Sequence, residues 1–267
     1  MMSDKTQLAP KRFTRPDPYD DKGRTADWDV DYLAELSRYD TAATLMQTIA
    51  KELKRPIRVL DVGCGEVLPL RVLISAYYVR KEAVLERYTA IDAQPMIHPP
   101  KGPVATRILS FCQRDLENDP TFPVETDSVD LVLSLESLEH MSRDVGRAWL
   151  ADLPRCLAEG GYFLISTPNG DISPGEPLYH VYEWGYRELI EELESLGLEN
   201  VWTAGVIIYK RMYKQAKLQG RISLSLWKLL EQRFGEMWTR VILAAPYPEL
   251  SRCIMALWRK KECDSES

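Results

Sequence analysis

The stretch at residues 58–78, RVLDVGCGEVLPLRVLISAYY, constrains the fold of this chain more than any other. An apolar run ends in Asp61, then Gly63 and Gly65 alternate, and a helical pattern follows. This order predicts a strand, a tight loop and a helix. Because glycine has no Cβ, the loop can adopt positive φ and bring its backbone close to a ligand at the helix N-terminus. The loop is therefore predicted to seat a small molecule.

The spacing of the glycines discriminates between two kinds of ligand. A dinucleotide-binding loop has the pattern G-x-G-x-x-G, and Leu68 stands where its third glycine belongs, which disfavours a nicotinamide dehydrogenase. Asp61 and the two glycines form D-x-G-x-G, which resembles motif I of the class I S-adenosylmethionine-dependent methyltransferases. The chain departs from many members at Val67, where they have a further glycine.

The resemblance implies a fold, a cofactor and an enzymatic activity. The expected fold is α/β and Rossmann-like, with a seven-stranded, mostly parallel sheet, an antiparallel last strand and a helical insertion before that strand. The implied cofactor is S-adenosyl-L-methionine, with its methionine half carried by the glycine loop. The resemblance covers about residues 58–206 and the final strand, so the remaining segments carry no family inference.

Length and charge limit the classes of function. The 267 residues suit one α/β domain with extensions. A net charge of −6 argues against a surface that binds nucleic acid over its whole extent. Residues 206–240 are nevertheless basic, since eight Lys and Arg face only Glu231 and Glu236, a local charge of +6. A small-molecule acceptor is therefore favoured, and nucleic acid is the less favoured partner.

Cysteine usage and hydropathy bear on the compartment. The five cysteines are scattered, without a C-x-x-C pair, which is typical of reduced thiols. The N-terminal segment is polar, and no uninterrupted apolar run approaches about 18 residues. We therefore expect a cytoplasmic protein that does not interact with a membrane. The sequence leaves its oligomeric state open.

The order of patterns predicts the domain organisation. A flexible tail (1–27) precedes leading helices (28–56), the methyltransferase domain spans 57–261 with a helical basic insertion at about 209–250, and a tail follows (262–267). The leading region is predicted to form two helices, the second capped by Asp40 or Thr41. In the resembling family such helices often close over the cofactor. Tyr32, Arg38 and Tyr39 are therefore candidates for cofactor contact, although packing or surface roles are favoured for them.

Further strands, helices and loops follow from periodicity and turn residues. A loop is expected at 94–106 and a helix at about 142–158, where Gly160 and Gly161 turn into the fifth strand. The other expected strands cover 87–93, 107–116, 129–134, 200–209 and 253–261, and a helix covers 184–196.

Acidic residues at strand ends predict the other half of the cofactor site. Asp92 ends the second strand, where a carboxylate can accept hydrogen bonds from both ribose hydroxyls. The resemblance implies that Asp115, at the end of the third strand, reads the adenine amino group; capping of a turn is the competing interpretation for both. The predicted cofactor-binding residues are Asp61, Gly63, Cys64, Gly65, Asp92, Ala93, Asp115, Leu116 and Leu135.

The acceptor side is predicted from the end of the fourth strand and a later loop. Methyl transfer from a sulfonium is an in-line displacement, which depends mainly on holding donor and acceptor in attack geometry. An alcohol or protonated amine must also lose a proton, for which a histidine or carboxylate is the natural base. Glu136 and His140 follow the fourth strand, and His180 lies on the later loop. We predict that His140, His180 and Glu136 are catalytic.

A more specific hypothesis involves the same residues. E-S-L-E-H (136–140) and H-V-Y-E-W (180–184) are similar to the E-x-x-E-H and H-x-F-E-W motifs of small-RNA 3′-terminal 2′-O-methyltransferases. There the two glutamates and two histidines bind a divalent metal, so the resemblance implies a metal site at Glu136, Glu139, His140 and His180. These patterns also recur in small-molecule methyltransferases, and a site without metal is favoured.

The basic insertion does not decide between these alternatives. Tyr209, Tyr213 and Trp227 lie among its cations, an arrangement suited to a phosphate backbone. An amphipathic lid with a solvated charged face is the favoured interpretation. A third alternative is a module that binds S-adenosylmethionine but has lost catalysis.

Overall fold

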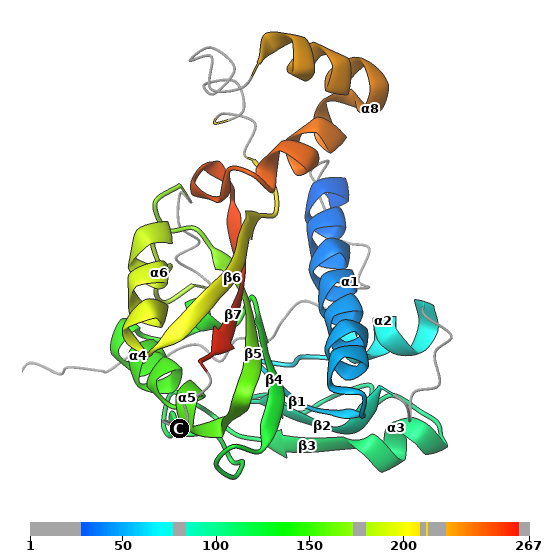
Figure 1. Cartoon of the computed structure of the whole chain (residues 1–267), viewed down its shortest axis with the longest axis vertical. Coiled ribbons are helices and arrows are strands. Elements are labelled where there is room, and N and C mark those ends of the chain that lie inside the picture. The colour runs from blue at the N-terminus through cyan, green and yellow to red at the C-terminus, as the bar shows by residue number, and fades with distance from the viewer. Residues whose placement is uncertain (1–27, 77–83, 173–179, 209–211, 213–222, 262–267) are drawn as a thin grey trace, which may run out of the picture.

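The computed structural model describes residues 28–76, 84–172, 180–208, 212 and 223–261 (Figure 1). It contains a seven-stranded sheet covered by helices on both faces. The strands are β1 (Ile57–Val62), β2 (Leu85–Asp92), β3 (Leu109–Gln113), β4 (Val129–Leu135), β5 (Leu157–Pro168), β6 (Leu198–Gly205) and β7 (Cys253–Lys260). The α-helices are α1 (Trp28–Leu53), α2 (Leu68–Ala76), α3 (Pro103–Ile108), α4 (Arg143–Ala151), α5 (Leu153–Cys156), α6 (Tyr186–Ser195) and α8 (Leu224–Ala244). Two short 3-10 helices are η2 (Leu138–His140) and η3 (Pro248–Leu250).

The strand order is β3-β2-β1-β4-β5-β7-β6. The first five strands pair in parallel, whereas β7 pairs antiparallel with both β5 and β6. This arrangement confirms the expected Rossmann-like fold with an antiparallel last strand. The parallel strands end at one edge of the sheet, which is where ligands bind in open α/β sheets.

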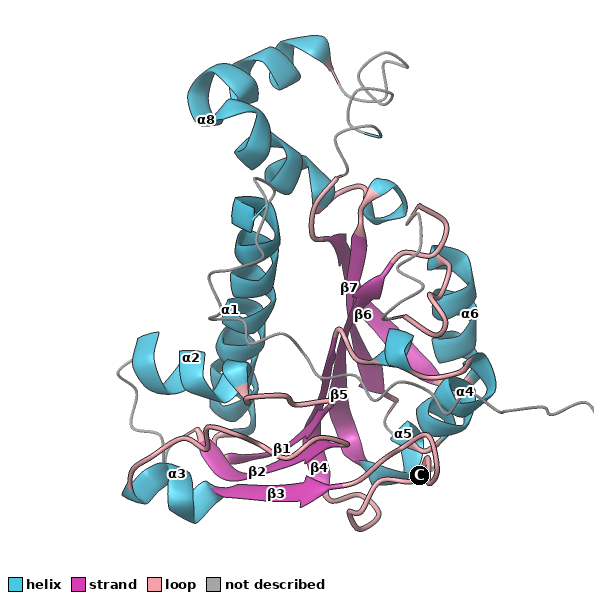
Figure 2. Ribbon diagram, turned by 180° about the vertical axis from the view of Figure 1, so that it is seen from behind, coloured by secondary structure: helices cyan, strands magenta, loops and turns pink. Residues whose placement is uncertain are grey.

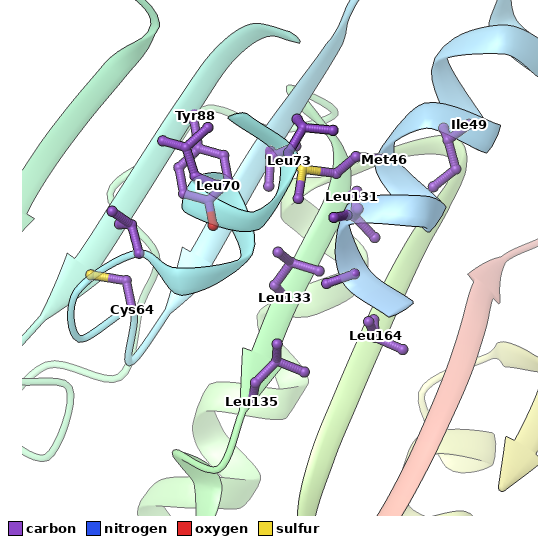
Figure 3. Close-up of a cluster of buried hydrophobic side chains, with 14 of the residues drawn as sticks. Met46, Ile49, Cys64, Leu70, Leu73, Tyr88, Leu131, Leu133, Leu135 and Leu164 are labelled. Atoms are coloured by element: carbon purple, nitrogen blue, oxygen red, sulfur yellow. The ribbon is translucent and has the colours of Figure 1, made fainter. Parts of the chain in front are cut away.

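Alternation along β4 explains why both faces of the sheet carry helices. Leu131, Leu133 and Leu135 join the core cluster that holds residues of α1 and α2, and Val132 joins the cluster under α4 and α6. A strand buried on both faces is uniformly apolar, and every residue of β4 except Asp130 and Ser134 is apolar. Figure 3 shows the first cluster, with Met46 of α1 beside the β4 leucines.

The leading region forms one helix, so the predicted division into two helices was wrong. The expected cap Thr41 lies inside α1, and its hydroxyl donates a hydrogen bond to the Ser37 carbonyl oxygen (2.7 Å). A threonine can satisfy its hydroxyl in this way without ending a helix. Ala42, Ala43 and Met46 are fully buried against the domain, and their burial stabilises the unbroken helix.

Several predicted boundaries also needed correction. The helix expected at 142–158 is two helices, because α4 ends at Ala151 and α5 restarts with Pro154 in its first turn. The loop expected at 94–106 already contains the start of α3, at Pro103. The fifth strand begins at Leu157, before the glycine pair, and the sixth strand is Leu198–Gly205 rather than 200–209. The helix expected at 184–196 is α6 (Tyr186–Ser195), and Gly197, with a φ of 76°, follows its C-cap residue Leu196.

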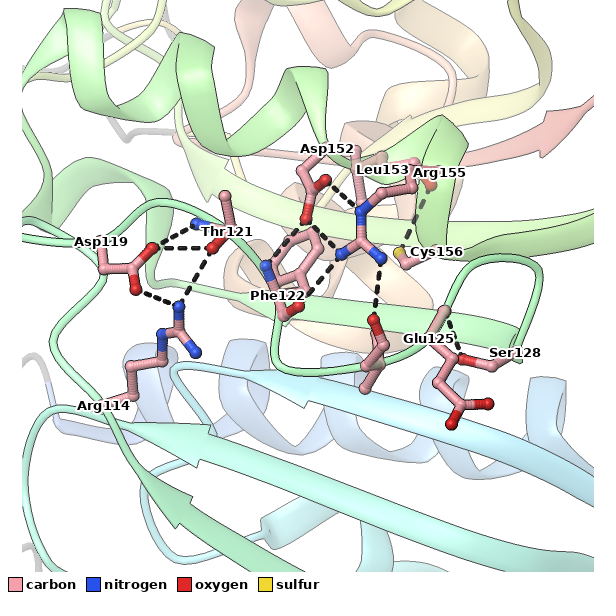
Figure 4. A network of polar contacts seen from close by, with 11 residues as sticks. Arg114, Asp119, Thr121, Phe122, Glu125, Ser128, Asp152, Leu153, Arg155 and Cys156 are labelled. Atoms are coloured by element: carbon pink, nitrogen blue, oxygen red, sulfur yellow. Dashed lines mark hydrogen bonds and ion pairs between the residues drawn. The ribbon is translucent and has the colours of Figure 1, made fainter.

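A polar network fixes the long loop between β3 and β4 (Figure 4). Arg155 of α5 donates hydrogen bonds to the Phe122 and Val124 carbonyl oxygens and pairs with Asp152. The Phe122 amide in turn donates to Asp152 (2.8 Å). These charge-assisted bonds tether the loop that begins with Asp115 to the helical layer.

Helix α8 lies in the predicted insertion and projects from the end of the sheet (Figures 1 and 2). It bends at Gly235, whose φ of 79° is not helical. Trp227 is fully buried, whereas Phe234 is half exposed. Residues 209–211 and 213–222 of the insertion, including Tyr209 and Tyr213, lie outside the described residues.

Two further observations concern the described residues only. None of their helices combines the length and apolar character needed to cross a membrane. Cys64, Cys112, Cys156 and Cys253 are all free thiols, while Cys263 lies outside the described part of the chain.

Candidate functional site

The glycine loop connects β1 to α2 at the ligand-binding edge of the sheet. Gly63 and Gly65 have φ values of 67° and 48°, in the region that favours glycine. At Gly63 an added Cβ would lie 2.3 Å from the Ser137 Cβ, so side chains are excluded there. Val67 also has a positive φ (50°), at the position where many members of the resembling family have glycine. The substitution therefore keeps the glycine-like backbone, at a cost in strain.

Asp61 lies beneath this loop and is 3% exposed. It accepts a hydrogen bond from the Tyr88 hydroxyl (2.6 Å). Burial raises the pKa of Asp61 from 3.8 to about 7, although the Tyr88 hydrogen bond acts in the opposite direction. A small cavity opens beside it, lined by Tyr39, Asp61, Gly63, Cys64, Glu66, Leu68, Pro69 and Leu135.

Raising the pH from about 4 to about 8 is expected to destabilise the unliganded protein relative to its Asp61→Asn variant. The folded chain keeps the Asp61 proton that the unfolded chain releases near its ordinary pKa of 3.8. The stabilisation is complete below that value and is lost as the pH rises through the folded pKa of about 7. Urea unfolding of both proteins across this range should show the variant gaining stability relative to the wild type. A difference that does not change with pH would contradict the assignment.

Asp92 links the second strand to the glycine loop. Its Oδ2 accepts the Gly65 amide (2.8 Å) and its Oδ1 accepts the Gln94 amide (2.8 Å). Each carboxylate oxygen has a second lone pair, so acceptance of ribose hydroxyls stays compatible with these bonds. The ribose role therefore stays a prediction, on a carboxylate that the loop holds in place.

The other predicted cofactor residues surround the same edge. Asp115 is exposed and accepts bonds from the Glu117 amide and the Asn118 side chain, which is the turn-capping arrangement; its adenine role stays a prediction. Ala93 is exposed, and Leu116, Leu135 and Cys64 are buried.

Two residues of the loop were missed by sequence reasoning. Glu66 accepts the Ile97 and His98 amides (both 3.0 Å), so it ties the segment after β2 to the glycine loop. Ser137 donates a hydrogen bond to the Val62 carbonyl oxygen (3.0 Å) and lies directly against Gly63. Each acts on a segment distant in sequence, so Glu66 had no local signal, and the E-S-L-E-H motif that contains Ser137 gave no role to that residue.

The predicted acceptor residues follow β4, the strand beside β1. Glu136 has a φ of 56°, and its carboxylate accepts a hydrogen bond from the Ser166 hydroxyl (2.6 Å). Glu139 is 1% exposed and accepts a bond from the Thr167 hydroxyl (3.1 Å). Burial, reinforced by the charge of Glu136, raises the pKa of Glu139 well above its usual range. Both glutamates are therefore held against the end of β5.

Backbone hydrogen bonds bring the later loop to the same place. The Val181 amide donates to the Glu139 carbonyl oxygen (2.8 Å), as does the Tyr182 amide (3.2 Å). The rings of His140 and His180 consequently lie 5.4 Å apart between centroids, edge to face. His180 Nδ1 contacts the Glu183 carboxylate. Glu183 belongs to the H-V-Y-E-W motif, but the sequence alone gave it no role. If Nδ1–H donates to Glu183, the other ring nitrogen, Nε2, is free to accept a proton.

A metal ion fits only part of the predicted ligand set. Glu139, His140 and His180 present ligand atoms that all lie within 4.8 Å of one another. Glu136 is not part of this group, and its carboxylate instead accepts a hydrogen bond from the Ser166 hydroxyl. The structure therefore gathers three of the four predicted ligands.

Comparison with known proteins gives two kinds of match. The family model described as "Methyltransferase domain" matches residues 33–208. A probable S-adenosylmethionine-dependent methyltransferase of Mycolicibacterium smegmatis is 38% identical over 155 residues, which are 55% of this chain and 54% of that protein. The chain thus spans about half the length of this curated relative.

Solved structures show the fold alone, since their sequence identities are low. An S-adenosylmethionine-dependent methyltransferase from Archaeoglobus fulgidus has a TM-score of 0.51 and 15% identity, over 83% of this chain and 94% of that one. One from Mesorhizobium loti has a TM-score of 0.51 and 14% identity, over 86% and 100%. The cyclase SpnF reaches 0.51 with 20% identity, over 83% and 81%. Structures with this fold thus carry different activities, and the side chains must decide the reaction.

Proposed function

This chain belongs to the S-adenosylmethionine-dependent methyltransferase family, and on that premise we propose that it transfers the methyl group to a nitrogen or oxygen of a small acceptor. The glycine loop, Asp61 and Asp92 would hold the donor. His180 would serve as the base, oriented by Glu183. The observation that carries the proposal is the pairing of His140 and His180 after the end of β4, the strand next to β1.

The two halves of the proposed site are adjacent along the chain. Leu135 lines the cavity at the glycine loop, and Glu136 begins the acceptor cluster. A donor seated on the loop would therefore direct its methyl group toward the histidines. Because the donor is already reactive, positioning in a site shielded from water supplies much of the acceleration. His180 would accept the proton that the nucleophile releases.

A screen with labelled S-adenosylmethionine tests this proposal. The labelled donor is incubated with the protein and with separate RNA, DNA, protein and metabolite extracts. We expect label in the metabolite fraction, and none from the His180→Ala variant. Label in RNA alone would contradict the small-acceptor proposal, and donor binding without transfer to any fraction would favour a catalytically inactive module.

The grouping of Glu139, His140 and His180 supports a second candidate, a divalent-metal-dependent RNA 2′-O-methyltransferase. These three residues would hold the ion, and a bound ion would stabilise the attacked hydroxyl as its oxyanion. The other residues would act as before, with the glycine loop binding the donor. Glu136 is absent from the metal-binding group, and a net charge of −6 disfavours binding of RNA, so this candidate ranks second.

Metal dependence separates the two candidates. Under the metal hypothesis, a chelator is expected to abolish transfer to RNA, and Glu139→Ala and His180→Ala should remove metal binding, measured by calorimetry with Mn²⁺. His98→Ala is the matched control, because His98 is exposed and lies outside the cluster. Equal activity with and without chelator would end this hypothesis.

A further inference from the structure

Arg38 of α1 is a buried arginine for which no hydrogen bond is found among the described residues. It is 6% exposed, and it makes no hydrogen bond with any of the described residues. Its Nε is buried and has no partner there. Guanidinium carries five N–H donors and stays charged, so a buried donor of this group that lacks a partner destabilises the protein. Such a group needs a partner from outside the described residues, which a ligand or an ordered water can supply.

Glu136 approaches Arg38 but does not saturate it. The closest nitrogen–oxygen distance between them is 3.8 Å, which is too long for a hydrogen bond. The Glu136 carboxylate instead accepts the Ser166 hydroxyl at 2.6 Å, and its other oxygen contacts the Cys253 thiol at 3.6 Å. The glutamate therefore offsets the charge of Arg38 without accepting a hydrogen bond from its guanidinium.

The contacts of Arg38 place it on the acceptor side of the site. Glu136, Ser166 and Cys253 lie where β4 and β5 end and β7 begins, and the charge of Glu136 acts on Glu139, which is grouped with the two histidines. The donor loop lies on the other side, where the next residue, Tyr39, lines the cavity with Asp61 and Gly63. Neighbouring residues of α1 thus face the two halves of the site.

We propose that Arg38 binds an oxyanion of the methyl acceptor, a carboxylate or a phosphate, and so selects acidic acceptors. The planar guanidinium fork matches the two oxygens of such a group. This inference rests on the proposed function and adds a substrate class to it. An oxyanion could also come from the methionyl carboxylate of the donor, and the experiment below separates the two sources.

Binding of inorganic phosphate tests the site without turnover. Phosphate line broadening in ³¹P NMR is recorded at constant ionic strength with saturating S-adenosylhomocysteine. We expect broadening with the wild type, its loss in Arg38→Met and partial retention in Arg38→Lys. Arg147→Met is the matched control, because Arg147 forms an ion pair with Glu192 on the surface (3.0 Å) and should leave broadening unchanged. Absent broadening, or equal broadening in Arg38→Met, would overturn the proposal.

Two further readouts assign the source of the oxyanion. S-adenosylhomocysteine and 5′-methylthioadenosine, which lacks the amino-acid portion, are titrated into wild type and Arg38→Met. If Arg38→Met binds each ligand as tightly as the wild type does, the acceptor assignment is supported. If the variant binds S-adenosylhomocysteine about tenfold more weakly but 5′-methylthioadenosine unchanged, Arg38 binds the carboxylate of the donor, and the proposal is overturned. Label should then enter only metabolites retained on an anion exchanger. Label in neutral metabolites overturns this inference. If the wild type labels no metabolite, the proposed function is contradicted instead, and the phosphate-binding experiment then decides whether Arg38 binds an oxyanion.

Discussion

Replacing Gly63 with alanine is expected to weaken binding of S-adenosylhomocysteine by about 100-fold, or about 2.7 kcal/mol. The new Cβ would lie 2.3 Å from the Ser137 Cβ and 2.9 Å from its Oγ. The residue would also keep a φ of 67°, which is strained for any residue with a Cβ. Either the loop or the turn after β4 must therefore move, and both border the cavity. Calorimetry measures the loss.

Two variants separate steric collision from backbone strain. Gly197→Ala introduces the same strain at a φ of 76°, but no atom lies within 4 Å of its added Cβ, so donor binding should be unchanged. Adding Ser137→Gly to Gly63→Ala removes the two closest atoms and should restore part of the affinity. Wild-type affinity in the Gly63→Ala single variant would contradict the assignment of the loop to the donor.

Replacing His180 with alanine is expected to lower kcat by about 10²- to 10⁴-fold, the usual contribution of a general base. S-adenosylhomocysteine should bind as before, because His180 lies outside the residues that line the donor cavity. Initial rates of label transfer to the acceptor fraction provide the measurement. Glu183→Gln should give a smaller loss, since it leaves the imidazole in place but weakens its orientation.

The third histidine supplies the control for this prediction. His98 is exposed, its backbone amide bonds Glu66, and its imidazole lies 3.8 Å from the same carboxylate, outside the histidine cluster, so His98→Ala should retain full activity. His140→Ala tests which ring accepts the proton. A wild-type rate in His180→Ala with a large loss in His140→Ala would transfer the role of base to His140.

Local patterns in the sequence predicted the strands that are buried on both faces. β4 was expected at 129–134 and spans Val129–Leu135, because a continuous apolar run between turn residues is typical of a parallel strand. The capping patterns were less informative. A threonine such as Thr41 can cap the start of a helix or bond its hydroxyl to a carbonyl oxygen within a helix. Thr41 does the second, because α1 continues through it and packs against the sheet.

The donor half of the site was visible in the sequence, but the acceptor half was visible only in part. Asp61, Gly63 and Gly65 share one motif of five residues, and their geometry follows from it. The contact of Arg38 with Glu136 instead joins a leading helix to the end of β4. Its existence depends on how α1 packs on the sheet, which no local pattern specifies. Glu66 and Ser137 escaped notice for the same reason.

Calorimetric titration of the wild type with S-adenosylhomocysteine and with NAD tests the central claim most directly. The D-x-G-x-G loop at Asp61, Gly63 and Gly65 lacks a third glycine at Leu68, which favours the first of these ligands over the second. We predict micromolar binding of S-adenosylhomocysteine and no binding of NAD. Failure to bind S-adenosylhomocysteine, or tighter binding of NAD, would contradict the account.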